Sequence, residues 1–460
     1  MANAAEQMAR NLNFGTFAKA KDLQARILFT LGILVLYRLG TYIPLPGLDP
    51  SQYAALFESQ AGGILGSMNL FAGGAVERMG IFALNVMPYI TASIIVQMMT
   101  TASPTLEKLK KEGEAGRKQL NQYTRYLTLV FALVQSFAIA GGLAAVRLEG
   151  ISSWFFILTG VVTLTGGTMM LMWMGEQITA RGIGNGISLI IFAGIVAELP
   201  RAIYNLVAQA RTTSVDIGFV LAIAFMVIAL IVFIVFIERS QRRLIIHYPK
   251  RQQSQGFAQG QRSFLPLKIN TAGVIPPIFA SALLMLPMTA VGFLGAGAAA
   301  DPNAASGILG WLAANFSPGS WTYIITYALL VVFFAFFYVA TVAFNSEETA
   351  ENLKKQGAFI PGIRPGASTA AYLDGIATRL TMLGAAYIAF VCAVPDLLHR
   401  DNLLPVYIGG TSLLIIVSVT IDTVARIQSA LIAQKYESLL KKTAQRGGGR
   451  GLLGAAPRKR

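Results

Sequence analysis

Long apolar runs separated by short polar segments dominate the pattern of this chain. Ten of these runs approach the length of a bilayer-spanning helix, which needs about 20 mostly apolar residues. They lie at 27–43, 76–99, 126–146, 154–174, 186–199, 217–237, 272–292, 321–344, 379–398 and 404–424. The run at 186–199 is short and spans only with its flanks. The pattern predicts an all-α polytopic membrane protein with ten transmembrane helices.

A shorter apolar segment, residues 64–74, precedes the second run and is bracketed by Gly62-Gly63 and Gly73-Gly74. It is too short to span a bilayer. Backbone that is not helical is stable at membrane depth only inside protein or beside a water-filled cavity. Two interpretations are open: a movable element that fills the cavity of a gated pore, and a short surface helix ahead of the second span.

Composition supports the membrane class. The chain has 460 residues, of which 54% are hydrophobic and 13% charged, whereas soluble domains carry about 25% charged residues. The single cysteine, Cys392, excludes an intrachain disulfide. The first residues lack the apolar core and cleavage site of a signal peptide, so we expect the first span to be retained.

The formal net charge of +15 is unevenly distributed. Lys and Arg concentrate before the first span, in three of the loops and in the tail, whereas the opposite loops contain few. This bias places both termini in the cytoplasm. The expected organisation is a cytoplasmic segment 1–26, a first half 27–200, an outer hinge loop 201–216, a second half 217–425 with cytoplasmic loops 238–269 and 345–378, and a basic tail 426–460.

The first large cytoplasmic loop predicts a β-hairpin. A β-rich run at 244–248 can pair with a second run at 263–267. Basic residues flank the first run, among them Arg242, Arg243 and Arg251. The resulting basic finger suits a phosphate backbone or an acidic protein surface. The general cytoplasmic bias toward Lys and Arg is the alternative explanation.

The second large cytoplasmic loop predicts a short helix capped by Ser346, with acidic residues in its first turn and lysines in its last. The sequence Pro-Gly-Ile-Arg-Pro-Gly then follows at 361–366. A residue before proline is restricted to extended geometry, so Arg364 is held stiffly between two turns. We interpret Arg364 as a contact for a partner.

No cluster of residues suited to catalysis or metal binding occurs in the sequence. Neither histidine has a ligand at metal-binding spacing, and there is no Walker-type phosphate-binding loop. We therefore expect no enzyme activity and no cofactor. The spans offer uncharged polar residues instead, including Ser93 and Gln97 in the second and Asn270 in the seventh. Such residues either bond helices together or form a polar seam that can part.

Eight segments of the chain resemble the SecY family, the channel subunits of the bacterial Sec protein-translocation system. They are 41–49, 69–95, 110–126, 175–195, 238–252, 265–284, 348–366 and 409–423. These segments occur in order along nearly the whole chain. They include TYIPLPGLD, NLFAGGAVERMGIFALNVMPYITASII and ETAENLKKQGAFIPGIRPG.

The resemblance implies two pseudo-symmetric five-helix halves around a central pore, with a short re-entrant plug helix at about 64–74. The plug residues that it implies are Ile64, Leu65, Met68, Leu70 and Phe71, and the pore-ring residues are Val86, Ile90, Ile191, Ile278 and Ile415. The implied lateral-gate residues are Ser93, Gln97 and Asn270. The residues implied to dock partners are Arg242, Arg243, Arg251 and Arg364. A narrow apolar ring excludes water and ions by dewetting.

The resemblance further implies a protein-conducting channel of the bacterial inner membrane with no cofactor. The implied partners are SecE-like and SecG-like subunits, a SecA-like motor ATPase, the ribosome, polypeptides with signal sequences, and membrane lipid. From the residues alone, a secondary transporter for small solutes is the main alternative, because it also explains a broken helix and a five-plus-five arrangement. An intramembrane enzyme and a membrane-anchored RNA-binding protein explain less of the chain.

Overall fold

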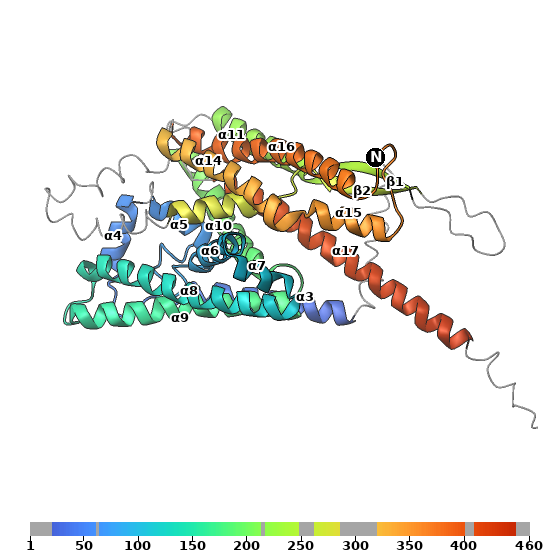
Figure 1. Cartoon of the computed structure of the whole chain (residues 1–460). Coiled ribbons are helices and arrows are strands. Elements are labelled where there is room, and N and C mark those ends of the chain that lie inside the picture. The colour runs from blue at the N-terminus through green and yellow to red at the C-terminus, as the bar shows by residue number, and fades with distance from the viewer. Residues whose placement is uncertain are drawn as a thin grey trace, which may run out of the picture.

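The chain forms two layers of helices with a third group between them (Figure 1). This computed structural model describes residues 21–60, 64–212, 217–247, 262–285, 320–400 and 409–447. The helices α3, α8 and α9 lie in one layer, α11, α14 and α16 lie in the other, and α5, α6 and α10 lie between them. The first layer comes from the N-terminal half of the chain and the second from the C-terminal half, as expected for two halves around a centre.

The helical bounds are α3 Lys21–Gly40, α4 Pro50–Gln60, α5 Ile64–Ala72, α6 Met87–Ala102, α7 Pro104–Lys111, α8 Glu114–Gly142, η1 Leu143–Val146, α9 Ser153–Arg181, α10 Gly186–Thr212, α11 Ile217–Arg239, α14 Trp321–Tyr338, η3 Val339–Ala343, α15 Ser346–Lys355, α16 Ala367–Arg400 and α17 Gly410–Gly447. An unlabelled helix covers Ile275–Met285. The strands are β1 Gln241–His247 and β2 Arg262–Lys268.

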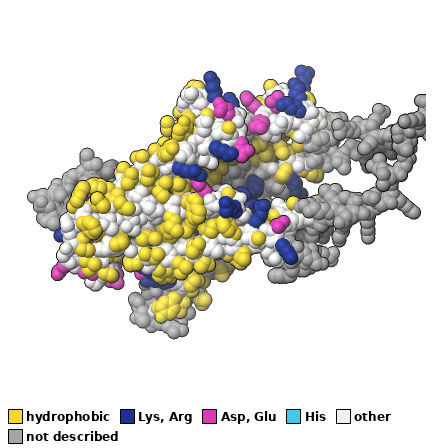
Figure 2. Space-filling view, turned by 90° about the horizontal axis from the view of Figure 1, so that it is seen from below, with side chains coloured by type: hydrophobic (Ala, Val, Ile, Leu, Met, Phe, Trp, Pro, Cys, Tyr) yellow, Lys and Arg dark blue, Asp and Glu magenta, His cyan; other side chains and the backbone are white. Residues whose placement is uncertain are grey.

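The predicted membrane class is confirmed. Eight helices of the described part are long and apolar enough to cross a membrane. The two remaining predicted spans, the second and the seventh, correspond to α6 and to the helix Ile275–Met285, which are shorter. Large apolar side chains such as Phe225 are widely exposed, and hydrophobic side chains cover much of the face in Figure 2. Such a surface suits lipid.

The prediction of a continuous helix over 76–99 is wrong in its first part. Residues 73–86 form a chain of turns, and α6 begins only at Met87. The turns carry positive φ angles at Gly73, Gly74 and Asn85. Apolar composition alone does not distinguish this irregular segment from a helix.

The irregular segment 73–86 is stable because protein surrounds it. Nearly all of its residues are buried. Its backbone bonds to the turn after α3, where the N–H of Leu45 donates to the Met79 carbonyl at 2.9 Å and the N–H of Ile81 donates to the Ile43 carbonyl at 2.9 Å. Irregular backbone is tolerated at membrane depth on this condition.

The first half ends in a longer helix than the sequence indicated. The prediction placed the fifth span at 186–199 and an outer loop at 201–216, but α10 continues to Thr212 through Pro200. Residues 213–216 lie outside the described part. Most of the expected hinge loop is therefore helical. A span predicted from hydrophobicity ends where polar residues begin, whereas the helix itself continues through them.

The predicted hairpin is confirmed. Strands β1 and β2 pair antiparallel, with Leu244 opposite Leu265. Leu244 and Leu267 pack against α16 through Leu373 and Ile376, so the hairpin is fixed to the second half. The helix α15 is also confirmed, although its cap is Asn345 rather than Ser346: the Asn345 side chain accepts from the Glu348 N–H at 3.2 Å.

Among the labelled helices of the described part, the two halves pack together mainly along one side. Helix α10 packs on α17 and α11, and α3 packs on α17. Within the described ranges, none of α6, α7 and α8 packs closely on α14, η3, α15 or α16. The side that carries α6 and α14 is therefore a seam at which these helices of the two halves make few direct contacts.

Candidate pore and gate

The five residues assigned to a pore ring are brought together in one apolar core. Val86 caps α6, Ile90 lies on its first turn, Ile191 is on α10, and Ile415 is on α17. Ile278 comes from the helix Ile275–Met285. All five are buried and belong to the same cluster. The cluster joins both halves at the centre of the molecule. The nearby Ala282, which is too small for a ring member, belongs to it as well.

The helix α5 packs against α10 beside this core. Met68 and Phe71, two of the five residues assigned to the plug, are buried in the cluster that holds the ring residues. The side chains of Ile64, Leu65 and Leu70 lie outside the described part of the structure. The short helix expected at 64–74 is therefore present, and it is seated inside the protein rather than on a surface.

Three side chains hold the carbonyl end of α5. The Asn85 amide donates to the Phe71 carbonyl, the Tyr37 hydroxyl donates to the Ala72 carbonyl at 3.3 Å, and the Arg38 guanidinium donates to the Gly73 carbonyl at 2.5 Å. The last carbonyls of a helix have no partner within it. These three residues therefore fix the position in which α5 is seated.

A polar chain links the other face of α5 to α10. The Asn69 side chain accepts from the Glu77 N–H at 2.9 Å. Glu77 in turn accepts two hydrogen bonds from the Arg201 guanidinium, at 2.5 and 2.7 Å. Sequence reasoning did not find Asn69, Tyr37 or Arg38. The asparagine at position 85 is a sequence feature that could have indicated a break in the helix here, because asparagine tolerates a positive φ where other side chains are strained.

Side-chain hydrogen bonds at the start of α4 and from Tyr53 on α4 stabilise this region. Ser51, through its hydroxyl and its N–H, holds the pKa of the Asp49 carboxyl below its usual range. Burial raises the pKa of the Tyr53 hydroxyl, which donates to the Val76 carbonyl at 2.5 Å. The Ser51 bonds stabilise the start of α4, and the Tyr53 bond ties α4 to the irregular segment 73–86.

The lateral-gate residues fall into two groups. The Gln97 amide donates to the Ser93 hydroxyl at 3.2 Å, one turn away on α6. Asn270 bonds elsewhere: its amide donates to Glu238 at 2.6 Å, and its oxygen accepts from the Gly273 N–H at 3.0 Å. Glu238 and Asn270 border a polar cavity of about 400 Å³ that also contacts α10 and α17. The structure does not bond Asn270 to the α6 pair.

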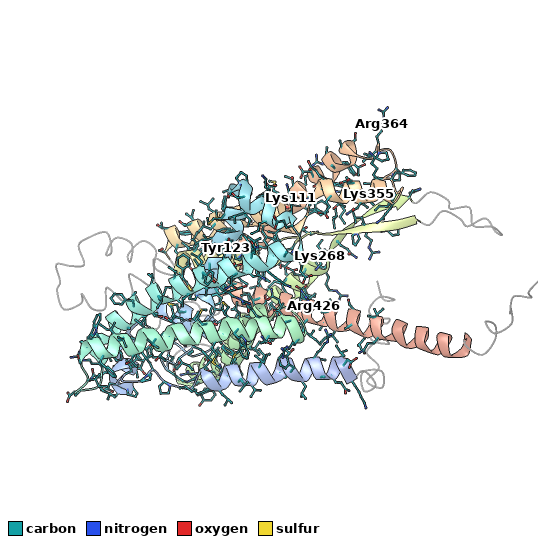
Figure 3. The ribbon with its side chains drawn as sticks, turned by 60° about the horizontal axis from the view of Figure 1, so that its bottom comes forward. Lys111, Tyr123, Lys268, Lys355, Arg364 and Arg426 are labelled. Carbon is teal, nitrogen blue, oxygen red and sulfur yellow. The ribbon has the colours of Figure 1, made fainter. Side chains whose placement is uncertain are left out.

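Three of the four residues assigned to docking, Arg242, Arg243 and Arg364, lie at the end of the molecule that carries the hairpin. Arg242 and Arg243 are exposed on β1. The N–H of His247 donates to the Phe359 carbonyl at 2.9 Å, so the hairpin and the loop after α15 form one unit. Arg364 is exposed on that loop and points away from the ribbon (Figure 3). Arg251 lies outside the described residues.

The Arg364 loop is locally rigid. Gly362 and Gly366 take positive φ angles of 83° and 111°. The Thr369 hydroxyl donates to the Arg364 carbonyl at 2.9 Å, and Ile363 packs on the apolar cluster between the hairpin and α16. The backbone is thus held on both sides of an exposed guanidinium, as the two proline–glycine pairs predicted.

Comparison with known proteins identifies the family to which this sequence is similar. The SecY family model matches residues 80–424. The protein translocase subunit SecY of Escherichia coli K12 is 48% identical over 438 residues, covering 93% of this chain and 96% of that protein. The subunit of the same name from Pseudomonas aeruginosa is 49% identical over 435 residues, covering 94% and 96%.

Solved structures show the same fold. A SecY structure, reported in a study of how the plug domain stabilises the closed translocation channel, has a TM-score of 0.65 at 19% identity. Sec61 in the canine ribosome–channel complex has a TM-score of 0.59 at 18% identity. Each comparison covers 88% of this chain and 92% of the other. With three quarters of its length matched by the family model and relatives nearly half identical over more than nine tenths of its length, this chain is a multi-pass membrane protein of the SecY family.

Proposed function

We propose that this chain is the channel subunit of a protein translocase and not an enzyme. It moves unfolded secretory proteins across the membrane and releases membrane proteins sideways into lipid. Its relatives in Escherichia coli and Pseudomonas aeruginosa are named for translocation. Among the described residues there is no cluster of His, Cys, Asp and Glu that could hold a metal ion.

One observation supports the pore most directly. Four segments from both halves bring Val86, Ile90, Ile191, Ile278 and Ile415 into one buried apolar cluster. An apolar constriction resists wetting and so blocks ions, yet it contains no hydrogen bonds that must break for the two halves to part. We assign these five residues to the ring that closes around a translocating chain.

The helix α5 is the plug in this proposal. Its buried side chains Met68 and Phe71 fill the centre beside the ring, and its carbonyl end is held by only a few hydrogen bonds. The seam between α6 and α14 is the lateral gate, with Ser93 and Gln97 on one side and Asn270 on the other half. An apolar signal helix leaves through this seam because it is more stable in lipid than in a wet pore.

The docking assignments come from the family resemblance, and the exposure of Arg242, Arg243 and Arg364 supports them. Arg242, Arg243, Arg251 and Arg364 form the docking surface for a SecA-like motor ATPase or the ribosome. This surface faces the cytoplasm, as do both termini, in the bacterial inner membrane. SecE-like and SecG-like subunits complete the complex, and the energy source binds from outside the chain.

Site-specific photocrosslinking tests the pore. A photoreactive residue replaces Ile90 in the full chain, reconstituted with its partner subunits in vesicles, and a secretory protein is stalled midway through translocation. We expect the stalled chain to crosslink at position 90. The matched control is the same residue at Phe225, which is 75% exposed on α11 and faces lipid.

The outcome separates the two leading functions. Crosslinking at position 90 and none at position 225 supports a polypeptide pore. A stalled polypeptide that never contacts position 90 refutes the ring. A small-solute transporter would then be the function to test.

A further inference from the structure

The seam between the halves is bridged at its cytoplasmic end. The ammonium group of Lys110, on α7, donates to the backbone carbonyl of Thr341, in η3, at 2.8 Å. Lys110 belongs to the first half and Thr341 to the second. Each of the other side-chain hydrogen bonds described above joins residues of the same half. Figures 1 and 3 show α7 beside α14 and α15.

Both partners are mechanically coupled to the helices that flank the seam. Ser103 is at once the C-cap of α6 and the N-cap of α7, and α8 begins at Glu114, three residues after α7 ends. On the other side, η3 continues α14 without a break at Tyr338. A hydrogen bond between Lys110 and Thr341 therefore resists separation of α6 and α8 from α14.

The Thr341 carbonyl is available to accept a hydrogen bond because it lies in a π-helix at the end of α14. Residues Val339–Ala343 form a π-helix, in which the Phe344 N–H donates to the Val339 carbonyl at 3.2 Å. This wider turn ends the helix, and its last carbonyls have no helical partner. The Thr341 hydroxyl donates back to the Phe337 carbonyl at 2.7 Å. The Thr341 carbonyl is left to accept from Lys110.

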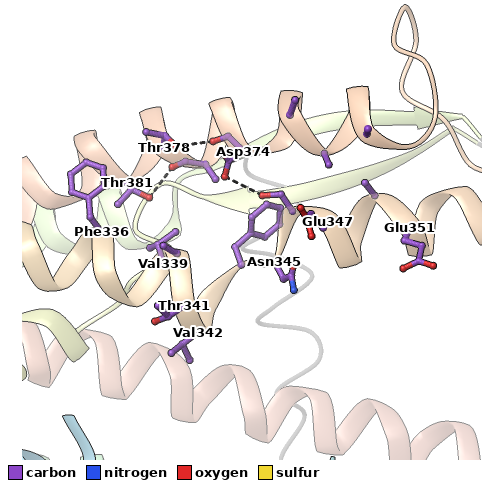
Figure 4. Close-up of a pocket in the computed structure, with 18 of the residues that line it drawn as sticks. Phe336, Val339, Thr341, Val342, Asn345, Glu347, Glu351, Asp374, Thr378 and Thr381 are labelled. Atoms are coloured by element: carbon purple, nitrogen blue, oxygen red, sulfur yellow. Dashed lines mark hydrogen bonds between the residues drawn. The ribbon is translucent and has the colours of Figure 1, made fainter. Parts of the chain in front are cut away.

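The cavity that Thr341 borders is lined by more acidic than basic residues. A cavity of about 920 Å³ lies between η3, α15 and the first turns of α16. Thr341 borders it together with Glu347, Glu351 and Asp374 (Figure 4), and Lys354 is the basic residue that lines it. The α7 side is basic on balance: its last turn holds Lys108, Lys110 and Lys111, and only Lys111 pairs with the acidic residue of this helix, Glu107, at 2.7 Å. Opposite charges across the seam attract and so favour contact.

We propose that Lys110 is a positioning residue of the gate: its bond to the Thr341 carbonyl, assisted by the acidic cavity, stabilises the closed seam and so sets how strong a signal sequence must be to open it. This inference rests on the proposed channel function. A ligand that separates the halves must break this bond, so weak signal sequences open the gate less often than strong ones.

The test replaces Lys110 in the full complex. Lys110→Met removes charge and donor but keeps a flexible chain, Lys110→Arg keeps both, and Lys108→Met is the matched control on the same helix. Two precursors are exported into vesicles, one with an intact signal sequence and one with a charge inserted in its apolar core. The measured quantity is the ratio of weakened to intact export.

We expect Lys110→Met to raise this ratio about two- to fivefold, the effect of one exposed bond from a charged donor. Lys110→Arg should restore the original ratio, and Lys108→Met should leave it unchanged. An unchanged ratio in Lys110→Met, or an equal rise in Lys108→Met, overturns the inference. In either case, export of the precursor with the intact signal sequence still supports the channel function. If the unaltered chain exports neither precursor, the channel function itself fails.

A second measurement does not depend on export. Cysteines replace Lys110 and Thr341, and a short bismaleimide joins them; the native Cys392 is buried and offers no competing thiol. We expect crosslinking in the resting complex and much less when a signal sequence occupies the gate. Equal crosslinking in both states contradicts a bond that breaks on opening.

Discussion

The hydroxyl of Tyr37 offers a direct measure of how firmly the plug helix α5 is seated. Tyr37 is fully buried on α3, and its hydroxyl donates to the Ala72 carbonyl at the end of α5. Its ring stacks on Phe82 with a centroid distance of 6.1 Å. The substitution Tyr37→Phe removes the hydroxyl alone, because phenylalanine keeps the ring and its packing.

The expected magnitude follows from the geometry. A buried hydrogen bond between neutral groups contributes about 1 kcal/mol. The 3.3 Å distance is long, and Asn85 and Arg38 still hold the neighbouring carbonyls, so we expect no more than this loss. A shift of about 1 kcal/mol changes the ratio of displaced to seated α5 about fivefold.

Ion leak through the resting channel is the assay. The variant is reconstituted in vesicles, and the rate of anion efflux per channel is compared with that of the unaltered chain. We expect leak to rise by up to about fivefold, since the conducting state is the minor one. The control is Ser136→Ala, which removes a buried 3.0 Å bond to Thr165 between α8 and α9, away from α5.

Two results would refute the reasoning. Leak that is unchanged in Tyr37→Phe, with the protein folded, would mean that the hydroxyl does not hold the plug. Leak that rises equally in Ser136→Ala would mean that any loss of a buried hydrogen bond loosens the channel, and that the site on α5 has no special role.

Three further predictions concern the plug, its contact with α10 and the docking loop. Deleting residues 64–74 should raise resting ion leak more than Tyr37→Phe does, and an unchanged membrane would count against a plug. Gly73→Val should destabilise the protein by about 3 kcal/mol, because Gly73 has a φ of 62° and its added Cβ would lie 2.7 Å from the Gly194 Cα; thermal unfolding in detergent measures the loss, and an unshifted transition would contradict the close packing. Arg364→Glu should abolish motor-driven export while the protein unfolds at its usual temperature. Normal export would remove the docking role.

Hydropathy predicted the membrane class and the positions of most spans because lipid imposes one strong requirement on every residue it contacts. It failed at residues 73–86 because that segment contacts protein rather than lipid, and buried irregular backbone is as apolar as a helix. The sequence does contain a local signal there. Pro88 lies in the first turn of α6, where proline is favoured, and it marks a helix that begins near this point.

The hairpin and the Arg364 loop were predictable because their signals are local: two nearby β-rich runs in one case and two proline–glycine pairs in the other. The partner of Asn270 was not. Glu238, which accepts its amide hydrogen, lies 32 positions earlier at the end of α11. Such a pair depends on how two helices are placed relative to one another, and no short-range pattern records it.

The order of elements along residues 64–102 constrains how the channel can open. Asn85 holds the Phe71 carbonyl of α5, Val86 is the next residue and belongs to the apolar ring, and α6 of the seam begins at Met87. Successive residues are joined by peptide units of fixed length, so a displacement of the start of α6 reaches Val86 and Asn85 unless the intervening φ and ψ angles absorb it. A displacement that moves Asn85 away from a stationary α5 by more than the narrow range of a hydrogen-bond distance releases the Phe71 carbonyl. The irregular backbone before α6 therefore brings the contact with the plug helix α5, the ring residue Val86 and the start of the seam helix α6 together within three residues. A continuous helix from residue 76 would separate them by whole turns.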